Sequence, residues 1–312
     1  MLVNKLRYFK RRIAIKLKQI RGGKLHSFSN KFTELIHNGA DIKLVASGFK
    51  FTEGPVWSAA DRCLYFSDIP GNTIYKIGEK NKISVFRQPS FHSNGLAFDR
   101  VGNLIVCEHQ NRCISKITEN GERVVLAESF NGKRFNSPND VIVKSDGTIF
   151  FTDPPYGIKE EESELPYQGV YRFDPVTQKT ELVIDDFLRP NGLAFSPDES
   201  LLYVDDSSER CHIRRFKLDH SGVPVKEIST IDFQSNKSGS PDGMKVDSDG
   251  NLYCTGPGGV WVFDNHGTHL GLIELPEQPS NCAWGEEEYR TLFITAETSV
   301  YKVKINITGN IV

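Results

Sequence analysis

Five polar side chains stand at the same place in successive copies of one sequence pattern, and their oxygen atoms suit a divalent metal ion. The five residues are Glu53, Asn94, Asn139, Asn191 and Asp242. Each opens a short apolar run, although Asn and Asp are disfavoured in β-strands. Carboxylate and amide oxygens are hard donors, which suit Ca²⁺ and, less well, Mg²⁺ or Mn²⁺. No Cys or His stands at any of the five positions.

The pattern itself is a strand, a turn and a second strand. It is clearest in PNGLAFSPDESLLYVDD, which runs from 190 to 206, and a weaker sixth copy places Ser280 or Asn281 at the matching position. The polar positions fall at 53, 94, 139, 191, 242 and about 281, at intervals of 41, 45, 52, 51 and about 39 residues. Self-similarity at such a period is the signature of a repeat architecture.

Two further strand-like runs follow most copies, for example TIYKI at 73–77 and ISVFR at 83–87. Four antiparallel strands repeated six times predict an all-β fold, a six-bladed β-propeller that spans residues 40–312. A strand near 42–48 precedes the first copy, and the last copy is one strand short. We expect this strand to complete the sixth blade, which removes two free edges. A pair of β-sandwiches is the alternative, but it does not explain six copies in phase.

The first strand of each propeller blade lines the central channel, so the polar residues would converge on one mouth of the channel. A plainer interpretation is that they form turns, because Pro-Asn-Gly and Pro-Asp-Gly favour turns. The hairpin turns are supplied elsewhere, however, by 196–199 in the fourth copy and 247–250 in the fifth. We therefore expect a ring of carboxylates and amides that binds a cation, with two carboxylates offsetting the buried charge.

Several stretches resemble the gluconolactonase and regucalcin (senescence-marker-protein) family, in particular its bacterial-type gluconolactonase branch. They include FTEGPVW, NGLAFD, FNSPNDVIVKSDGTIFFTDPPYG and PDGMKVDSDGNLYCTGPGGV, and the likeness runs from about Phe51 to Ala296. The resemblance implies a six-bladed lactonase that uses a divalent cation to hydrolyse a sugar-type lactone. Another metal-dependent hydrolase on the same scaffold, such as a phosphotriesterase, and a non-enzymatic calcium-binding propeller are the alternatives.

The resemblance also implies a ligand set for the cation. Glu53, Asn191 and Asp242 would hold it, and Asn139 would be a further ligand or a substrate contact. Ca²⁺ is the first expectation, with Mg²⁺, Mn²⁺ or Zn²⁺ as alternatives. Regucalcin-like members carry an Arg two positions before the residue that matches Asn139. Here Ser137 stands at that position, so the sugar contacts of that branch do not carry over.

Lactone hydrolysis needs a group that takes the proton from the attacking water. We expect Asp242 to be this base, with Glu53 as the second choice. Asn94, Asn139 and His109 would bind or orient the substrate, and specificity would lie in rim loops such as 154–168 and 206–212. Neither the nucleophile elbow G-x-S-x-G nor the phosphate loop G-x-x-x-x-G-K-[ST] occurs, which disfavours covalent serine hydrolysis.

Residues 1–30 form a basic segment ahead of the propeller. Nine Lys or Arg and no acid lie in residues 1–24, where apolar residues recur at spacings of three and four, as in an amphipathic helix. A helix that contacts an anionic membrane surface is one interpretation. A helix docked on the body and a partly disordered tail are the alternatives. The remaining chain carries 29 basic and 40 acidic residues, so it has no basic footprint for nucleic acid.

The six cysteines form no C-x-x-C pair and lie mostly in apolar strand patterns. We interpret them as buried free thiols in a reducing compartment, with a disulfide as the alternative. No run of about 18 apolar residues exists, so no segment is expected to span a membrane. We expect a cytoplasmic protein, with peripheral membrane contact as the alternative, that is a monomer or a weak homo-oligomer.

Overall fold

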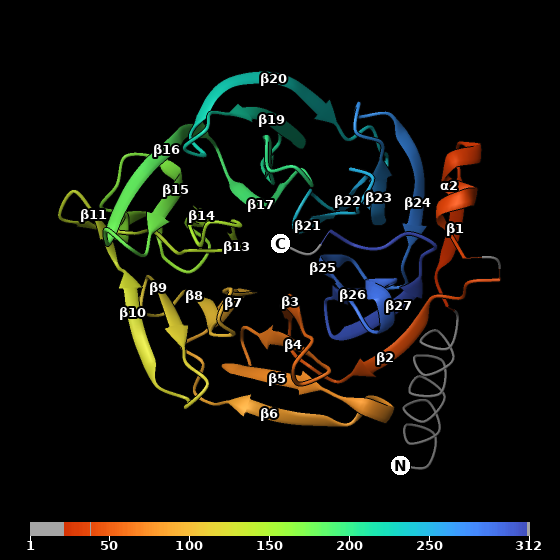
Figure 1. Cartoon of the computed structure of the whole chain (residues 1–312), viewed down its shortest axis with the longest axis horizontal. Helices are drawn as coiled ribbons and strands as arrows, with labels where there is room; N and C mark the ends of the chain where they lie inside the picture. The colour runs from red at the N-terminus through yellow and green to blue at the C-terminus, as the bar shows by residue number, and fades with distance from the viewer. Residues whose placement is uncertain (1–21, 38, 311–312) are drawn as a thin grey trace, which may run out of the picture.

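The computed structural model describes residues 22–37 and 39–310. Within these residues six antiparallel sheets surround a central channel and radiate outward from it (Figure 1). The all-β, six-bladed propeller that the sequence repeat predicted is therefore confirmed. The segment 1–21, on which the prediction of membrane contact depends, lies outside the described residues.

Each of the first four blades consists of four strands in chain order, with the first along the channel and the fourth outermost (Figure 1). Blade 1 contains β3 (Thr52–Ser58), β4 (Cys63–Asp68), β5 (Thr73–Ile77) and β6 (Ile83–Arg87). Blade 2 contains β7 (Ser93–Phe98), β8 (Leu104–Glu108), β9 (Cys113–Ile117) and β10 (Arg123–Ala127). Blade 3 contains β13 (Val141–Val143), β14 (Ile149–Asp153), β15 (Gln168–Asp174) and β16 (Lys179–Phe187). Blade 4 contains β17 (Pro190–Phe195), β18 (Leu201–Asp206), β19 (His212–Leu218) and β20 (Pro224–Asp232).

The sixth blade combines both ends of the propeller sequence. It contains β25 (Pro279–Gly285), β26 (Thr291–Ala296), β27 (Ser299–Lys304) and, as its outer strand, β2 (Lys43–Ser47). Strands β2 and β27 are antiparallel, and Ala46 lies opposite Val300. This pairing joins the beginning of the ring to its end, and it covers the edge of β27 that would otherwise be free.

The fifth blade has one strand more than the repeat predicted. It contains β21 (Met244–Val246), β22 (Leu252–Gly256), β23 (Gly259–Phe263) and β24 (His269–Glu274), and β1 (Lys24–Ser27) pairs with β24 on the outside. The sequence analysis placed residues 1–30 ahead of the propeller, and the structure differs for β1. A Cβ atom at Gly23 would lie 2.0 Å from the carbonyl oxygen of Glu274, so glycine permits this close approach.

Helix α2 (Asn30–Leu35) follows β1 and covers the outer side of blade 5 (Figure 1). The Ser29 hydroxyl caps it by accepting a hydrogen bond from the Phe32 N–H at 3.2 Å. Phe32 and Leu35 are buried against the core between blades 5 and 6. Short elements elsewhere are β11 (Ser129–Phe130), β12 (Lys133–Arg134), η1 (Glu79–Asn81), η2 (Glu160–Glu162) and η3 (Glu287–Tyr289). None of the helices in the described part of the chain has the length and apolar character needed to cross a membrane.

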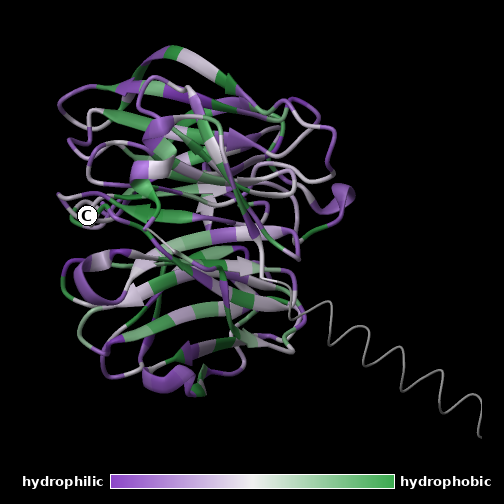
Figure 2. Ribbon diagram, turned by 90° about the vertical axis from the view of Figure 1, so that its right-hand side faces the viewer, coloured by the Kyte–Doolittle hydropathy of each residue, from purple (hydrophilic) through white to green (hydrophobic). Residues whose placement is uncertain are grey.

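The hydrophobic core lies between neighbouring blades. Phe150 of blade 3 and Phe195 of blade 4, for example, pack edge to face with their ring centroids 5.2 Å apart. Figure 2 shows hydrophobic residues concentrated along the strands and hydrophilic residues at the loops. The inner strands of a blade, such as β14 and β26, are therefore buried on both faces, while outer strands such as β6 and β20 are largely exposed.

Closure of the ring by β2 leads to a stability prediction. Ala46 is buried in a cluster that joins blades 6 and 1, whereas Leu44 on the same strand is 39% exposed. We expect Ala46→Asp to lower the free energy of unfolding by roughly 3 kcal/mol or more, because it buries an unpaired carboxyl group. Leu44→Asp is the matched control and should cost much less. Urea unfolding of both variants measures the difference, and equal losses would contradict a closing role for β2.

Candidate active site

The polar positions of the repeat meet at one mouth of the central channel. Glu53, Asn94 and Asn191 are each the second residue of a first strand, in β3, β7 and β17, while Asn139 and Asp242 lie two residues before β13 and β21. A cavity of about 520 Å³ is lined by all five of them and by His109. The structure thus brings together the six residues that the sequence analysis named for metal binding, substrate binding and catalysis.

Glycine explains how the first strands come close enough for this convergence. The residue after the polar position is glycine in four blades, and a Cβ atom there would collide with the next blade. At Gly192 it would lie 2.0 Å from the carbonyl oxygen of Asp242, and at Gly54 it would lie 2.1 Å from that of Asn94. The Gly95 N–H donates to the carbonyl oxygen of Asn139 at 2.8 Å, which ties blade 2 to blade 3.

The three asparagines form a continuous row of hydrogen bonds along the cavity wall. The side-chain amide of Asn94 donates to that of Asn139, which in turn donates to that of Asn191. The Asn191 amide donates to the Ser207 hydroxyl at 2.8 Å, and this hydroxyl donates to the Pro241 carbonyl at 2.7 Å. Side chains from blades 2 to 4 are thereby held in fixed orientations next to the peptide that carries Asp242.

Glu53 lies on the other side of the cavity, and one of its carboxylate oxygens has no hydrogen-bond partner among the described residues. Its Oε2 accepts hydrogen bonds from the backbone N–H of Gly54 and from Asn281 Nδ2, the latter at 3.1 Å. Its Oε1 is buried and has no hydrogen-bond partner among the described residues, and the same is true of Asn94 Oδ1. Buried oxygens without partners are costly to the fold unless a further group satisfies them.

The carboxyl groups of the cavity are hard to ionise in the absence of positive charge. Burial and the nearby Asp140 carboxylate raise the pKa of Glu53 to about 8. Burial, with further repulsion from Glu53 and Asp205, raises the pKa of Asp242 well above its ordinary value. A divalent cation would reverse both effects and satisfy the Glu53 oxygen. The donor set therefore fits a hard cation, although among the described residues no three His, Cys, Asp or Glu side chains cluster into a metal site without help from amides.

The sixth blade departs from the predicted ring. The Ser280 hydroxyl is turned into the blade, where it donates to the Thr52 carbonyl at 2.7 Å and lies 2.9 Å from the Thr295 hydroxyl. Asn281 takes the place that glycine has in other blades and donates to Glu53 and, at 3.5 Å, to Asp140. Neither Ser280 nor Asn281 lines the cavity, so five blades contribute polar positions to it.

Comparison with known proteins gives a match to one family over most of this chain. A family model described as SMP-30/Gluconolactonase/LRE-like region matches residues 51–298. The chain belongs to this family. A gluconolactonase of Zymomonas mobilis is 36% identical over 92% of this chain and 87% of its own length. Family membership confirms the resemblance that the sequence motifs indicated.

Solved structures give the same result for the fold. A gluconolactonase of Xanthomonas campestris matches with a TM-score of 0.83 and 32% identity over 92% of this chain and 99% of that protein. A calcium-binding regucalcin of Agrobacterium tumefaciens matches with a TM-score of 0.73 over 86% of this chain and 94% of that protein. Its identity of 19% supports a shared fold only.

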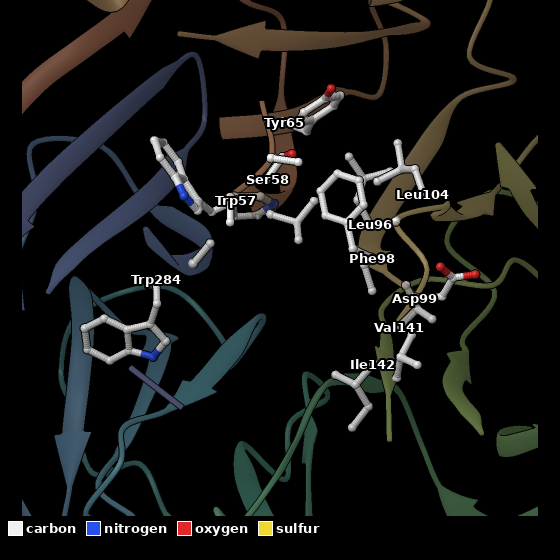
Figure 3. Close-up of a pocket in the computed structure, with 18 of the residues that line it drawn as sticks. Trp57, Ser58, Tyr65, Leu96, Phe98, Asp99, Leu104, Val141, Ile142 and Trp284 are labelled. Carbon is white, nitrogen blue, oxygen red and sulfur yellow. The ribbon is translucent and has the colours of Figure 1, made fainter. Parts of the chain in front are cut away.

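The opposite mouth of the channel differs in character from the polar cavity. It opens into a cavity of about 700 Å³ with a mainly apolar lining, in which Trp57, Phe98, Ile142 and Trp284 surround the hollow (Figure 3). In each blade, the residue three positions after the polar position faces this side. These residues are Val56, Ala97, Ile142, Ala194, Lys245 and Ala283. At these first-strand positions, carboxylate and amide side chains therefore face only one end of the channel.

Tyr156, Arg189 and Ser207 are among the lining residues of the polar cavity that were not predicted as site residues. Tyr156 and Ser207 belong to the two loops that the sequence analysis expected at the rim. Of these three, only Arg189 could have been suspected from the sequence, because it lies two positions before Asn191. Sequence position alone does not say toward which side a loop residue points, so these contacts depend on the tertiary structure.

The carboxylates that end second strands hold the loop that enters the first strand of the same blade. Asp68 accepts hydrogen bonds from the backbone N–H groups of Lys50 and Phe51, each at 3.1 Å. In blade 4 this role belongs to Asp206, the second of two adjacent aspartates. The buried carboxyl of its neighbour Asp205 lies instead against Gly192 on the channel side.

His109 supplies a prediction about pH. Burial lowers its pKa to about 4, so the imidazole beside Asn94 is neutral between pH 5 and pH 8. We expect His109→Gln to keep the pH dependence of kcat/KM over that range and to raise KM about fivefold, the effect of one neutral hydrogen bond. Loss of an inflection between pH 6 and pH 7 in the variant would instead show that His109 titrates during turnover.

The same shift predicts a change in stability. Because the pKa of His109 is about 4 in the folded chain and near 6.5 in an unfolded one, the unfolded state binds the proton first as the pH falls. The free energy of unfolding should therefore decrease between pH 6.5 and pH 4 by more in the wild type than in His109→Gln. Urea unfolding at pH 7 and pH 4.5 measures this difference.

Proposed function

We propose that this chain is a metal-dependent lactonase that hydrolyses a sugar-type lactone in the polar cavity. The observation that carries the proposal is the convergence of two carboxylates and a row of fixed amides, with an unpartnered Glu53 oxygen, at one mouth of the channel. The relative from Zymomonas mobilis is named a gluconolactonase. A glucono-1,5-lactone type of substrate is therefore the first to test.

The residues that would hold the cation are Glu53, Asn139, Asn191 and Asp242. Ca²⁺ suits this set best, because it accepts several neutral and anionic oxygen ligands in flexible geometry, while Mg²⁺, Mn²⁺ and Zn²⁺ are alternatives for the binding experiment. When bound, a divalent cation polarises the lactone carbonyl and stabilises the negative charge that develops on its oxygen. The Asn row keeps its members oriented before substrate arrives, which lowers the cost of assembling the site.

Asp242 is better placed than Glu53 to take a proton from the attacking water. Glu53 is almost fully buried, and its Oε2 is already engaged by Gly54 and Asn281. The Asp242 side chain is only partly buried and faces the cavity. We therefore assign the base to Asp242 and a purely ligating role to Glu53. Asn94, Asn139 and the neutral His109 would hydrogen-bond the ring oxygen or hydroxyl groups of the substrate.

The proposal includes a cytoplasmic location. All six cysteines are free, and four of them are buried. Free thiols in this number are typical of a reducing compartment. Contact of the basic residues 1–24 with an anionic membrane surface remains a prediction from the sequence.

The carboxylate roles can be separated by substitution. Glu53→Gln removes a ligand charge, so its affinity for Ca²⁺ should fall about tenfold or more. Asp242→Asn keeps an oxygen donor but not the proton acceptor. It should retain Ca²⁺ with reduced affinity and lose a factor on the order of 10² in kcat. Calorimetry with Ca²⁺ and turnover of glucono-1,5-lactone, with and without EDTA, give both quantities.

Glu181→Gln is the matched control, because Glu181 lies on the surface in an ion pair with Arg172. It should change neither quantity. Turnover that survives both EDTA and Asp242→Asn would overturn the mechanism. Ca²⁺ binding without hydrolysis of any lactone would favour a non-enzymatic calcium-binding propeller, and hydrolysis of organophosphate triesters alone would favour a phosphotriesterase.

A further inference from the structure

The rim of the polar cavity contains one residue with a permanent positive charge. The residue two positions before the polar position lines the cavity in four of the blades. These residues are Phe51, Arg189, Ser240 and Gln278. Arg189 is the single Lys or Arg among the described residues that line it. The mechanism proposed above gives this side chain no role.

The backbone that carries Arg189 is held firmly. The buried Asp206 carboxylate accepts hydrogen bonds from the N–H groups of Leu188 and Arg189, at 3.1 and 3.0 Å. The Ser207 N–H donates to the Arg189 carbonyl at 2.9 Å. Asn191, which is part of the proposed ligand set, lies only two residues farther along. The base of the Arg189 side chain is therefore fixed relative to the reacting centre.

The guanidinium group of Arg189, in contrast, is free to bind a ligand. It is exposed and makes no ion pair or side-chain hydrogen bond with any residue that the structure describes. Arg214, elsewhere in blade 4, has acidic partners at 2.6 Å (Asp186) and 2.5 Å (Glu227). Arginine binds carboxylate and phosphate groups with two parallel hydrogen bonds, so an unpaired one at a cavity rim suits an anion.

Positive and negative charges lie on different sides of the cavity rim. Glu53 and Asp242 would offset a divalent cation, and no acidic side chain of the described residues forms an ion pair with Arg189, so its charge is not balanced on its own side. The other charged rim residue is the exposed Glu297. It belongs to the junction of blades 6 and 1, where its carbonyl accepts the Thr52 N–H at 2.7 Å. An anionic group would be attracted toward Arg189 and repelled from Glu297.

We infer that Arg189 selects sugar lactones that carry a negatively charged group, such as a phosphate or a carboxylate, at the end of the carbon chain remote from the ring carbonyl. This inference rests on the proposed lactonase function. The lactone carbonyl would face the ring of Glu53, Asn191 and Asp242, while the anionic end would lie at the blade-4 rim against Arg189. Arg189 is thus a specificity-determining residue of the same cavity.

A matched pair of substrates tests the inference. The probes are glucono-1,5-lactone and 6-phosphoglucono-1,5-lactone, with initial rates corrected for spontaneous hydrolysis. We expect the wild type to prefer the phosphorylated lactone. Arg189→Gln should lower kcat/KM for that lactone about tenfold or more, mainly through KM, because it removes a charge-assisted pair of hydrogen bonds. The value for the neutral lactone should stay within about threefold.

Two further variants sharpen the result. Arg189→Lys should restore part of the preference, since it returns the charge without the planar fork. Arg172→Gln, which removes a partly buried arginine of blade 3 that lies outside the cavity, is the control and should leave the hydrolysis of both lactones unaffected. Equal losses for the two lactones in Arg189→Gln would overturn the inference, and so would a wild type that does not distinguish them.

Binding without turnover separates this inference from the proposed function. Calorimetry of the Ca²⁺-loaded protein should show tighter binding of 6-phosphogluconate than of gluconate, and Arg189→Gln should abolish the difference. If neither lactone is hydrolysed but this preference is observed, the lactonase proposal fails and anion recognition by Arg189 stands. Equal binding of the two sugar acids by the wild type would overturn the inference whatever the activity.

Discussion

The first strands of neighbouring blades approach one another until their backbones touch, and the site depends on this contact. Gly54 and Gly192 face carbonyl oxygens of the next blade at distances that leave no room for a Cβ atom. The approach brings residues separated by 41 to 52 positions in the sequence around one small cavity. Because blades pack at crystal-like density, the ring cannot widen locally to accommodate a side chain there. The spacing of the donor atoms is therefore a property of the whole propeller.

A site assembled from several blades requires a ring that does not open. Strand β2 supplies this by pairing with β27, so that the last blade contains residues from both ends of the propeller sequence. The cavity contains residues from both sides of the closing blade. Glu53 lies in β3, the strand that follows β2, while Asp242 comes from the fifth blade. Separation of the sixth blade would move one carboxylate away from the other. Fold stability and cation binding are consequently linked through the same few strands.

The repeat supplies the scaffold, and departures from the repeat supply the chemistry. Glycine follows the polar position in four blades, but Asp140 and Asn281 take its place in the other two and fill the channel beneath the cavity. Lys245 is the one charged residue in the ring that faces the apolar mouth, and its charge lowers the pKa values of Glu53 and Asp140 that burial raises. Such concentrated acidic groups weaken the fold until positive charge arrives, so a bound cation should stabilise the folded state by mass action.

The sequence by itself determined the number of blades and the five polar positions of the cavity, because a repeat in phase places equivalent residues at equivalent points around an axis. His109 followed from the same register, at the end of a second strand. The tertiary structure alone decided the pairing of β1 with β24, because that contact joins residues about 250 positions apart and depends on the close approach at Gly23. It also decided that Ser280 turns into its blade, and that Asp206 rather than Asp205 holds the loop bearing Arg189. Strand periodicity specifies which residues alternate, whereas loop direction and bulged register are set by the packing of blades that are distant in the sequence.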